Sequence, residues 1–326
     1  MSALPTDGRV VALSGGVGGA KLALGLYRVL PPDSLTVIVN TGDDFDHLGL
    51  RICPDLDTTL YTLAGLAHPE AGWGRRDETW TFMRALESLG SETWFRLGDG
   101  DLALHVERTR RLARDESLTA FIGATARRLG IRAAIVPMSD DPVRTRVMTD
   151  HGELGFQEYF VRLRCEPAVR SLRFEGAAAA NVSAAAADAL DQPGLAAVIV
   201  CPSNPFLSID PILAVPEMRS LLKQAAAPVI AVSPLIGEHA VKGPTAKIMR
   251  ELGWTVAATS VAEHYGDLID GFVLDERDRE QAGRVQVPLA MTDTLMTGLP
   301  DRERVARAAL ALARELRDPG PAEGPV

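Results

Sequence analysis

A run of glycines directly after a short apolar segment constrains the fold of this chain more than any other feature. The apolar segment, residues 10–13, is typical of a strand that is buried on both faces of a parallel sheet. Four glycines follow within residues 15–19, and a helical pattern begins at Lys21. Glycines let backbone N–H groups approach a phosphate closely, and a helix start adds partial positive charge. The candidate phosphate-binding residues are therefore Gly15, Gly16, Val17, Gly18, Gly19 and Lys21.

This glycine run matches neither of the two common nucleotide-binding fingerprints. A P-loop requires Ser or Thr after its lysine, whereas Leu22 follows Lys21. The pattern G-x-G-x-x-G, started at Gly16, ends on Lys21 instead of a glycine. A tight turn without a ligand is the alternative interpretation. So many glycines together favour a phosphate site, but they leave the nucleotide open.

Apolar runs alternate with helical patterns along the rest of the chain, which predicts an α/β fold. We expect a Rossmann-like, mostly parallel sheet with helices on both faces. The expected single domain covers residues 1–318, with a helical lobe inserted at about residues 60–130 and a flexible Pro/Gly-rich tail at 319–326. Further strands are predicted in five segments: residues 35–39, 131–137, 195–200, 229–232 and 271–275.

Composition excludes several classes of protein. The 326-residue chain has a formal charge of -9 and no Lys/Arg-rich run, which argues against a nucleic-acid surface. No stretch approaches the roughly 20 apolar residues that span a bilayer, and the first nine residues do not resemble a signal peptide. The three cysteines are far apart and form no C-x-x-C. We therefore expect reduced thiols and a cytoplasmic protein, without disulfides or a zinc site.

An acidic pair follows the predicted strand at residues 35–39. Asp43 and Asp44 are expected at the carboxyl edge of the sheet, beside the glycine run. Adjacent carboxylates suit Mg²⁺, which takes oxygen ligands and shares itself with substrate phosphates. Gly-Asp-Asp is also turn chemistry, so a plain turn is the alternative. The predicted phosphate site next door favours a metal site at Asp43 and Asp44.

A second acidic segment begins at Pro54. Asp55 suits the N-cap of a helix that runs towards Leu66, and Asp57 suits its first turn. Helix capping alone is enough to explain both acids. However, residues 43–57 contain five aspartates and no lysine, which packing does not require. A metal or a hydroxyl-bearing substrate accounts for this bias.

Other polar positions are weaker candidates for ligand contacts. Ser203 and Asn204 follow the predicted strand at residues 195–200, where a phosphate contact and a plain loop are equally good interpretations. Lys242 is a candidate cation for a phosphate or carboxylate. Residues 155–162 suit either an edge strand or a substrate wall. We interpret three arginines of the inserted lobe as a solvated helix face: Arg108, Arg110 and Arg111.

Several short motifs, in their order and spacing, resemble the 2-phospho-L-lactate transferase family of coenzyme F420 biosynthesis. The resemblance runs from about Val10 to Ala290. The motifs are Gly15-Gly16-Val17-Gly18-Gly19-Ala20-Lys21, Asn40-Thr41-Gly42-Asp43-Asp44, Pro54-Asp55-Leu56-Asp57-Thr58, Gln157-Glu158-Tyr159-Phe160-Val161, Pro202-Ser203-Asn204-Pro205, Ser208-Ile209-Asp210-Pro211-Ile212-Leu213 and Lys242-Gly243-Pro244.

The resemblance implies a Mg²⁺-dependent transfer by a cytoplasmic homodimer. A guanosine-diphosphate-linked donor carries a phospho-acid, and the ribityl hydroxyl of the deazaflavin Fo attacks its phosphorus, so that GMP leaves. The group transferred is phospholactyl, phosphoenolpyruvyl or phosphoglyceryl. The resemblance implies that Asp57 contacts Fo, where it would orient or deprotonate the attacking hydroxyl. Asp43 and Asp44 are the expected metal ligands.

Two positions depart from the family pattern. Relatives commonly have Lys or Arg between the aspartates of Gly-Asp-x-Asp, where that residue touches Fo, and this chain has Gly100. A contact with Fo from Gly100 has to come from its backbone. The second glycine of Ser-Pro-Ile-x-Gly-Gly is replaced here by Glu238.

Two other functions fit parts of this sequence pattern. A related group of regulatory proteins binds nucleotide-sugars without transfer, but the segments around Asp43 and Asp57 favour the enzyme. A nicotinamide-dependent oxidoreductase is disfavoured by the broken G-x-G-x-x-G and by an acidic corner that repels a pyrophosphate unless a metal intervenes.

Overall fold

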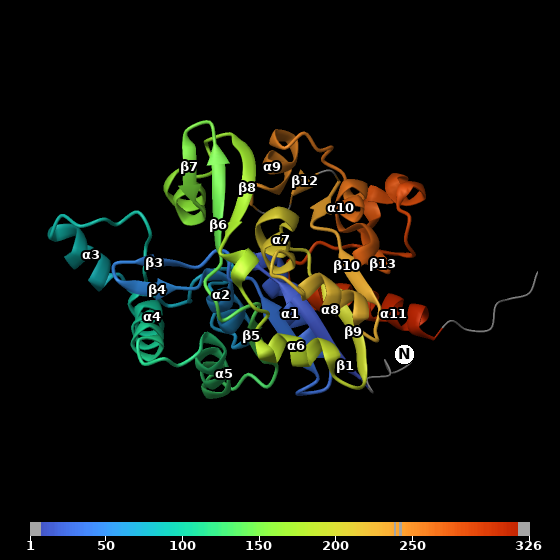
Figure 1. The fold of residues 1–326 in the computed structure, drawn as a ribbon, viewed down its shortest axis with the longest axis horizontal. Helices are drawn as coiled ribbons and strands as arrows, with labels where there is room; N and C mark the ends of the chain where they lie inside the picture. Colours follow the sequence, from blue (N-terminus) through green and yellow to red (C-terminus); the bar gives the residue numbers. More distant parts are fainter. Residues whose placement is uncertain (1–7, 238, 241–242, 319–326) are drawn as a thin grey trace, which may run out of the picture.

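Seven short strands form one parallel sheet at the centre of the protein (Figure 1). The computed structural model describes residues 8–237, 239–240 and 243–318. The strand order is β14-β13-β10-β9-β1-β2-β5, and all neighbouring pairs are parallel. The strands are β1 (Arg9–Ser14), β2 (Leu35–Val39), β5 (Ala134–Pro137), β9 (Leu195–Val200), β10 (Val229–Val232), β13 (Gly271–Asp275) and β14 (Leu289–Thr292).

Both faces of the sheet are covered by helices, because successive residues of each strand point to opposite faces. Val10 and Ala12 pack under one layer and Val11 and Leu13 under the other. The first layer contains α1 (Gly16–Val29), α2 (Pro54–Leu63), α5 (Leu118–Arg128) and α11 (Leu299–Arg317). The second contains α6 (Ala184–Asp191), α7 (Asp210–Leu213), α8 (Met218–Gln224), α9 (Thr245–Glu251) and α10 (Ala258–Tyr265). The predicted fold class is therefore confirmed.

The predicted helical insertion lies between β2 and β5 in the chain. It contains a hairpin of β3 (Phe45–His47) and β4 (Leu50–Ile52), followed by α2, α3 (Thr81–Ser88), α4 (Asp99–Leu112) and α5. Since α2 and α5 pack on the sheet, only the hairpin, α3 and α4 project from it (Figure 1). A small core stabilises this projecting part, centred on Ile52, Met83 and Leu97.

A second, three-stranded antiparallel sheet was not predicted. It consists of β6 (Arg144–Thr149), β7 (Gly152–Gly155) and β8 (Val169–Glu175), in the order β7-β6-β8. Residues of β6 alternate between half-buried and buried, so the strand lacks a continuous apolar run. Residues 158–162, for which an edge strand was one interpretation, form a single helical turn instead.

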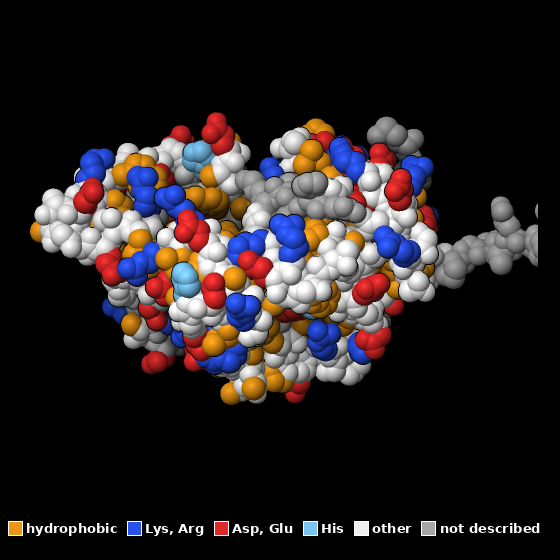
Figure 2. Space-filling model, turned by 90° about the horizontal axis from the view of Figure 1, so that it is seen from above, with side chains coloured by type: hydrophobic (Ala, Val, Ile, Leu, Met, Phe, Trp, Pro, Cys, Tyr) orange, Lys and Arg blue, Asp and Glu red, His pale blue; other side chains and the backbone are white. Residues whose placement is uncertain are grey.

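The remaining elements are short. They are β11 (Leu235–Ile236), β12 (His239–Ala240), η1 (Glu158–Arg162), η2 (Ala177–Ala179), η3 (Pro205–Ile209), η4 (Gly266–Leu268) and η5 (Glu276–Arg284). No helix within the described ranges has the length and apolar character needed to cross a membrane. On the face shown in Figure 2, Lys and Arg side chains are interspersed with Asp and Glu side chains. The predicted tail, residues 319–326, lies outside the described residues.

Candidate active site at the carboxyl edge of the sheet

The strand order creates a crevice at the carboxyl ends of β1 and β9. The chain leaves β1 towards β2 on one side, whereas β9 pairs with β1 on the other side. Loops that leave two such strands diverge, and ligands of open α/β sheets bind between them. The crevice opens into a cavity of about 640 Å³. The cavity is lined by residues of the glycine run, by Pro202, Ser203 and Asn204, and by parts of the insertion and the second sheet.

The glycine run forms the first turn of α1. The prediction that the helix starts at Lys21 is wrong, since α1 begins at Gly16. The glycines permit close approach of neighbouring backbone: a Cβ on Gly18 would lie 2.5 Å from the Pro202 carbonyl oxygen. A Cβ on Gly19 would lie 2.5 Å from the Ser203 hydroxyl. Four of the predicted phosphate-site residues, Gly15, Gly16, Val17 and Gly18, line the cavity together with Lys21, and Gly19 lies behind them.

The loop after β9 is fastened to the glycine run. The Ser203 hydroxyl donates to the Gly15 carbonyl at 2.8 Å and accepts from the Gly15 N–H at 3.1 Å. The Ser203 hydroxyl, which was a candidate phosphate contact, is thus bonded to Gly15 and helps to shape the crevice. Asn204 Oδ1 accepts from the N–H groups of Phe206 and Leu207, and this orients the amide. Asn204 Nδ2 is buried without a hydrogen-bond partner, and Asn204 lines the cavity.

The two predicted lysines differ in what the structure shows. Lys21 lines the cavity, and its Nζ donates to the Met296 carbonyl at 2.8 Å. This contact places the ammonium group against the segment that follows β14. Lys242 lies outside the described residues.

Asp43 and Asp55 form an acidic corner beside the glycine run. Asn40 Nδ2 donates to Asp43 Oδ1 and to Asp55 Oδ2, each at 3.0 Å. Both aspartates are buried and line the cavity. Burial, and then the charge of Asp55, raises the pKa of Asp43 well above its ordinary value. Burial raises the pKa of Asp55 to about 6, although the Asn40 amide and the Gly16 N–H oppose the shift.

Asp44 points away from this corner. It is buried but does not line the cavity, and its Oδ1 has no hydrogen-bond partner. Burial raises the pKa of Asp44 to about 7, against the charge of Arg144. Thus the structure separates the two adjacent acids: Asp43 faces the cavity and Asp44 lies behind it. Asp55, predicted only as a helix cap, lies instead in the first turn of α2 and reaches the cavity.

Asp57 is held by a fully buried arginine. Arg108 Nη1 donates to Asp57 Oδ2 at 3.1 Å, Nη2 contacts Oδ1, and Nη1 lies 3.2 Å from the Arg51 carbonyl oxygen. The exposed fraction of Arg108 is 0%, so the interpretation of this residue as part of a solvated helix face is wrong. Burial lowers the pKa of Arg108, but the Asp57 carboxylate raises it by more. The pKa of the guanidinium is therefore above its ordinary value.

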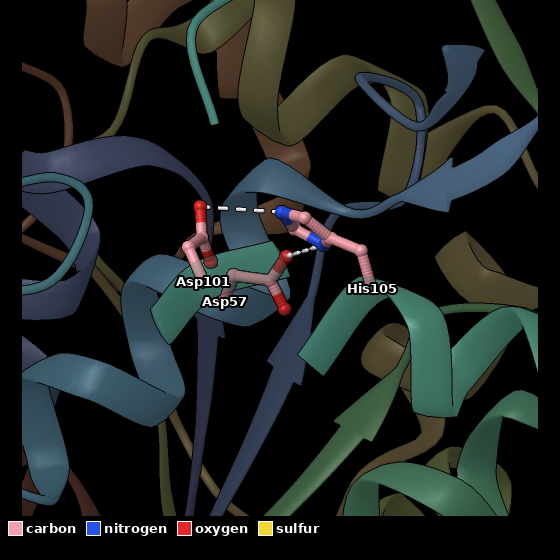
Figure 3. A group of neighbouring side chains, drawn as sticks. All are labelled: Asp57, Asp101 and His105. Atoms are coloured by element: carbon pink, nitrogen blue, oxygen red, sulfur yellow. Dashed lines mark ion pairs between the residues drawn. The ribbon is translucent and has the colours of Figure 1, made fainter. Parts of the chain in front are cut away.

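His105 extends the buried ion pair towards Asp101 (Figure 3). Its Nδ1 lies 3.4 Å from Arg108 Nη1 and 3.7 Å from Asp57 Oδ2, and its Nε2 lies 3.2 Å from Asp101 Oδ2. Tyr61 donates to Asp101 Oδ1 at 2.6 Å.

Asp57, Asp101 and His105 also have the proximity of a metal-binding group. Within the part of the chain that the structure describes, their potential ligand atoms lie within 4.8 Å of one another. However, Arg108 contacts both oxygens of Asp57, and its positive charge opposes a cation there. We therefore interpret these side chains as an ion-pair network that joins α4 to α2.

Gly100 does not line the cavity. Its N–H donates to Glu78 Oε2 at 2.7 Å, and its carbonyl accepts from Arg75 at 3.4 Å. Glu78 also accepts from the Asp101 N–H at 2.8 Å, so its carboxylate caps α4. Asp101 lies in the first turn of this helix.

Aromatic side chains also line the cavity. Trp73, Trp94 and Phe95 come from the insertion, and Phe156 and Phe160 come from the segment that follows β7. Phe156 and Phe160 are stacked, with ring centroids 5.3 Å apart. Residues of the segment 155–162 therefore form part of the cavity wall, and its role as a substrate wall stays a prediction. The tryptophans were missed, although three of the four in the chain fall within residues 73–94.

Comparisons with known proteins agree on one family. The family described as "2-phospho-L-lactate transferase CofD" matches residues 10–297. The phosphoenolpyruvate transferase of Streptomyces avermitilis is 41% identical over 325 residues, covering 95% of this chain and 100% of that protein. The 2-phospho-L-lactate transferase of Methanopyrus kandleri is 41% identical over 317 residues, covering 94% and 98%.

A solved structure supports the fold alone. A member of the UPF0052 family from Bacillus halodurans has a TM-score of 0.63 and 15% identity. The similarity covers 93% of this chain and 99% of that one.

Proposed function

Since the chain belongs to the 2-phospho-L-lactate transferase CofD family, we propose that it transfers a phospho-acid group from a guanosine-diphosphate-linked donor to the ribityl hydroxyl of Fo. GMP is the leaving group. The observation that carries this proposal is a single cavity lined by two kinds of group. Its glycines, flanked by acids, suit a diphosphate, and its aromatic side chains suit the ring of the acceptor.

The residues at the acidic corner fit a divalent cation. Asp43 and Asp55 are buried carboxylates that line the cavity and share the Asn40 amide. These are hard oxygen donors, and Mg²⁺ is usually held by one or two carboxylates together with substrate phosphates. We propose Asp43 as the ligand that faces the cavity, with Asp55 beside it. Asp44, expected from the sequence as the second ligand, lies behind this corner. A bound Mg²⁺ would neutralise charge on the donor phosphates.

The protein groups then have distinct roles in binding the donor. The N–H groups at the start of α1 bind the diphosphate, and Lys21 adds positive charge nearby. Asn204 Nδ2, which lacks a protein partner, donates to the donor. The acceptor oxygen forms a bond to the phosphorus that bears the acid as the bond to GMP breaks. Such transfers depend mainly on positioning and charge neutralisation.

For Asp57 we propose an orienting role rather than proton abstraction. Burial raises the pKa of Asp57 despite the charge of Arg108, and both oxygens contact the Arg108 guanidinium, so the carboxylate is held in a fixed orientation. Asp57 does not line the cavity, but Thr58, the next residue of α2, does. An Asp57→Asn variant with unchanged activity would contradict this role.

A mass-spectrometric assay tests the proposed function. Purified protein is incubated with Fo, Mg²⁺ and the phospholactyl, phosphoenolpyruvyl and phosphoglyceryl donors in competition. We expect a phosphodiester-linked Fo product and GMP, and the product mass identifies the donor. Binding of a guanine nucleotide with no turnover of any donor would instead support a regulatory protein.

A Gly18→Ala substitution should weaken donor binding. The new Cβ would lie 2.5 Å from the Pro202 carbonyl oxygen, so α1 and the β9 loop must separate. Overpacking of this kind costs about 1–3 kcal/mol, which corresponds to roughly a tenfold loss of affinity for GDP in a titration. Gly283→Ala is the control, because nothing lies within 4 Å of its Cβ. Equal GDP affinities for the two variants would contradict the predicted phosphate site.

Stability without a cation should fall as the pH rises. Unfolded aspartates ionise near the ordinary pKa of 3.8, whereas burial raises the pKa of Asp55 to about 6 and that of Asp44 to about 7. The stability that these groups contribute is therefore present below about pH 4 and is lost as the pH rises through about 6 to 7. We expect Mg²⁺ to raise the melting temperature more at about pH 7.5 than at about pH 5.5. An Asp55→Asn variant should show a smaller difference between the two pH values.

A further inference from the structure

Arg96 presents to the cavity a positive charge that has no acidic partner among the described residues. Its exposed side chain lines the cavity, and its position in the chain directly follows Trp94 and Phe95. Among the described residues, its guanidinium forms no hydrogen bond or ion pair. Two other arginines of the insertion already have acidic partners: Arg75 lies near Glu78, and Arg108 contacts Asp57. Arg96 is thus available to a ligand.

The guanidinium of Arg96 is nonetheless held in place. It lies over the Trp80 ring, 4.2 Å from the ring centroid. Trp80 in turn packs against the small core around Ile52, Met83 and Leu97. A cation fixed on one aromatic face keeps its donor edge and its second face for another partner.

Two exposed aromatic side chains line the same cavity and favour a planar ligand. Trp73 is 60% exposed and Phe160 is 38% exposed, and they come from segments far apart in the chain. Trp73 lies between Gly72 and Gly74, both in the left-handed conformation with φ of 76° and 68°. Hydrogen bonds from the Gly72 N–H to the His68 carbonyl, and from the His68 N–H to the Gly74 carbonyl, close this turn. The indole is therefore presented on an ordered turn.

We propose that Arg96 is a binding residue for the acceptor ring, which it recognises beside Trp73 and Phe160. The inference rests on the proposed function, which supplies a deazaflavin as acceptor. A deazaflavin is a planar ring system with carbonyl groups along one edge, and it matches a guanidinium that donates in one plane and stacks on its face. The diphosphate of the donor finds its partners at the glycine run.

Direct titration with Fo tests this assignment. Binding is followed by calorimetry for the wild-type protein, Arg96→Gln, Arg96→Lys and Trp73→Leu. We expect Arg96→Gln to weaken Fo binding about tenfold or more. Arg96→Lys should give an intermediate loss, because lysine keeps the charge without the planar fork. Trp73→Leu should also weaken Fo binding, while GDP affinity stays unchanged in all three variants.

The matched control is Arg84→Gln. Arg84 is an exposed arginine of α3 that bonds Thr81 and does not line the cavity, so its removal should leave Fo binding unchanged. Unchanged Fo affinity in Arg96→Gln would overturn the proposal. A rise in the donor KM without a change in Fo affinity would also overturn it and would assign Arg96 to the donor carboxylate. Fo binding by the wild-type protein without turnover of any donor would reject the proposed function and leave the role of Arg96 decided by the titration.

Discussion

Asp43→Asn should lower kcat by on the order of 100-fold or more while the protein remains folded. Asp43 is the proposed metal ligand that faces the cavity, and a bound cation is worth several kcal/mol of charge stabilisation in a transfer of this kind. The amide keeps the shape of the side chain and its hydrogen bond with Asn40, but it removes the negative charge. Steady-state kinetics with saturating Fo and donor measure the loss.

The stability of the same variant separates a catalytic role from a structural one. Burial and the charge of Asp55 raise the pKa of Asp43, so an ionised Asp43 is destabilising without a cation. Asp43→Asn should therefore melt at the same temperature as the wild type or higher, and it should lose the thermal shift with Mg²⁺. Asp46→Asn is the control, because Asp46 is exposed and pairs with Arg51. Full activity in Asp43→Asn, or an equal loss in Asp46→Asn, would contradict the proposed metal site.

Arg108→Met should destabilise the folded protein by about 3–5 kcal/mol, the usual cost of removing one partner of a buried ion pair. The substitution leaves the Asp57 carboxylate buried without its guanidinium, and it removes the donor that faces His105 Nδ1. The effect is measured as a lower midpoint in urea unfolding.

The double variant Asp57→Leu/Arg108→Met provides the critical comparison. Replacing both members of a buried pair by apolar residues is often neutral or stabilising. The double variant should therefore recover most of the stability that Arg108→Met loses. The single variant Asp57→Leu completes the comparison. If the loss of unfolding free energy in the double variant equals the sum of the losses in Asp57→Leu and Arg108→Met, Asp57 and Arg108 do not act as a pair. Arg110→Met is the surface control, because Arg110 is exposed and pairs with Glu107 on the same helix.

The parallel sheet was predictable because its strands are buried on both faces. The runs at residues 35–39, 195–200, 229–232 and 271–275 coincide with β2, β9, β10 and β13. By contrast, β6 contains only two apolar residues, Val147 and Met148, and β14 is a half-exposed edge strand. Such strands lack the continuous apolar run that reveals a doubly covered strand.

The candidate site was predictable where the chain itself places residues at strand ends. The glycine run and Asp43 follow β1 and β2 directly, so sheet topology brings them together. Arg108 was misread because an arginine on a polar helix normally faces solvent. Only its contact with Asp57, 51 residues away in the chain, explains its burial. The aromatic side chains of the cavity come likewise from segments far apart in the chain, the insertion and the segment after β7, which the order of residues alone does not bring together.

The bonds between Ser203 and Gly15 join residues 188 positions apart. A nascent chain that has exposed only β1 and α1 therefore lacks one wall of the donor pocket, however well its first helix forms. Contacts of such large sequence separation form late, because loop closure must precede them. Donor binding should thus appear only after β9 has emerged and joined the sheet. Premature termination anywhere before β9 should yield products that carry the glycine run without affinity for a nucleotide.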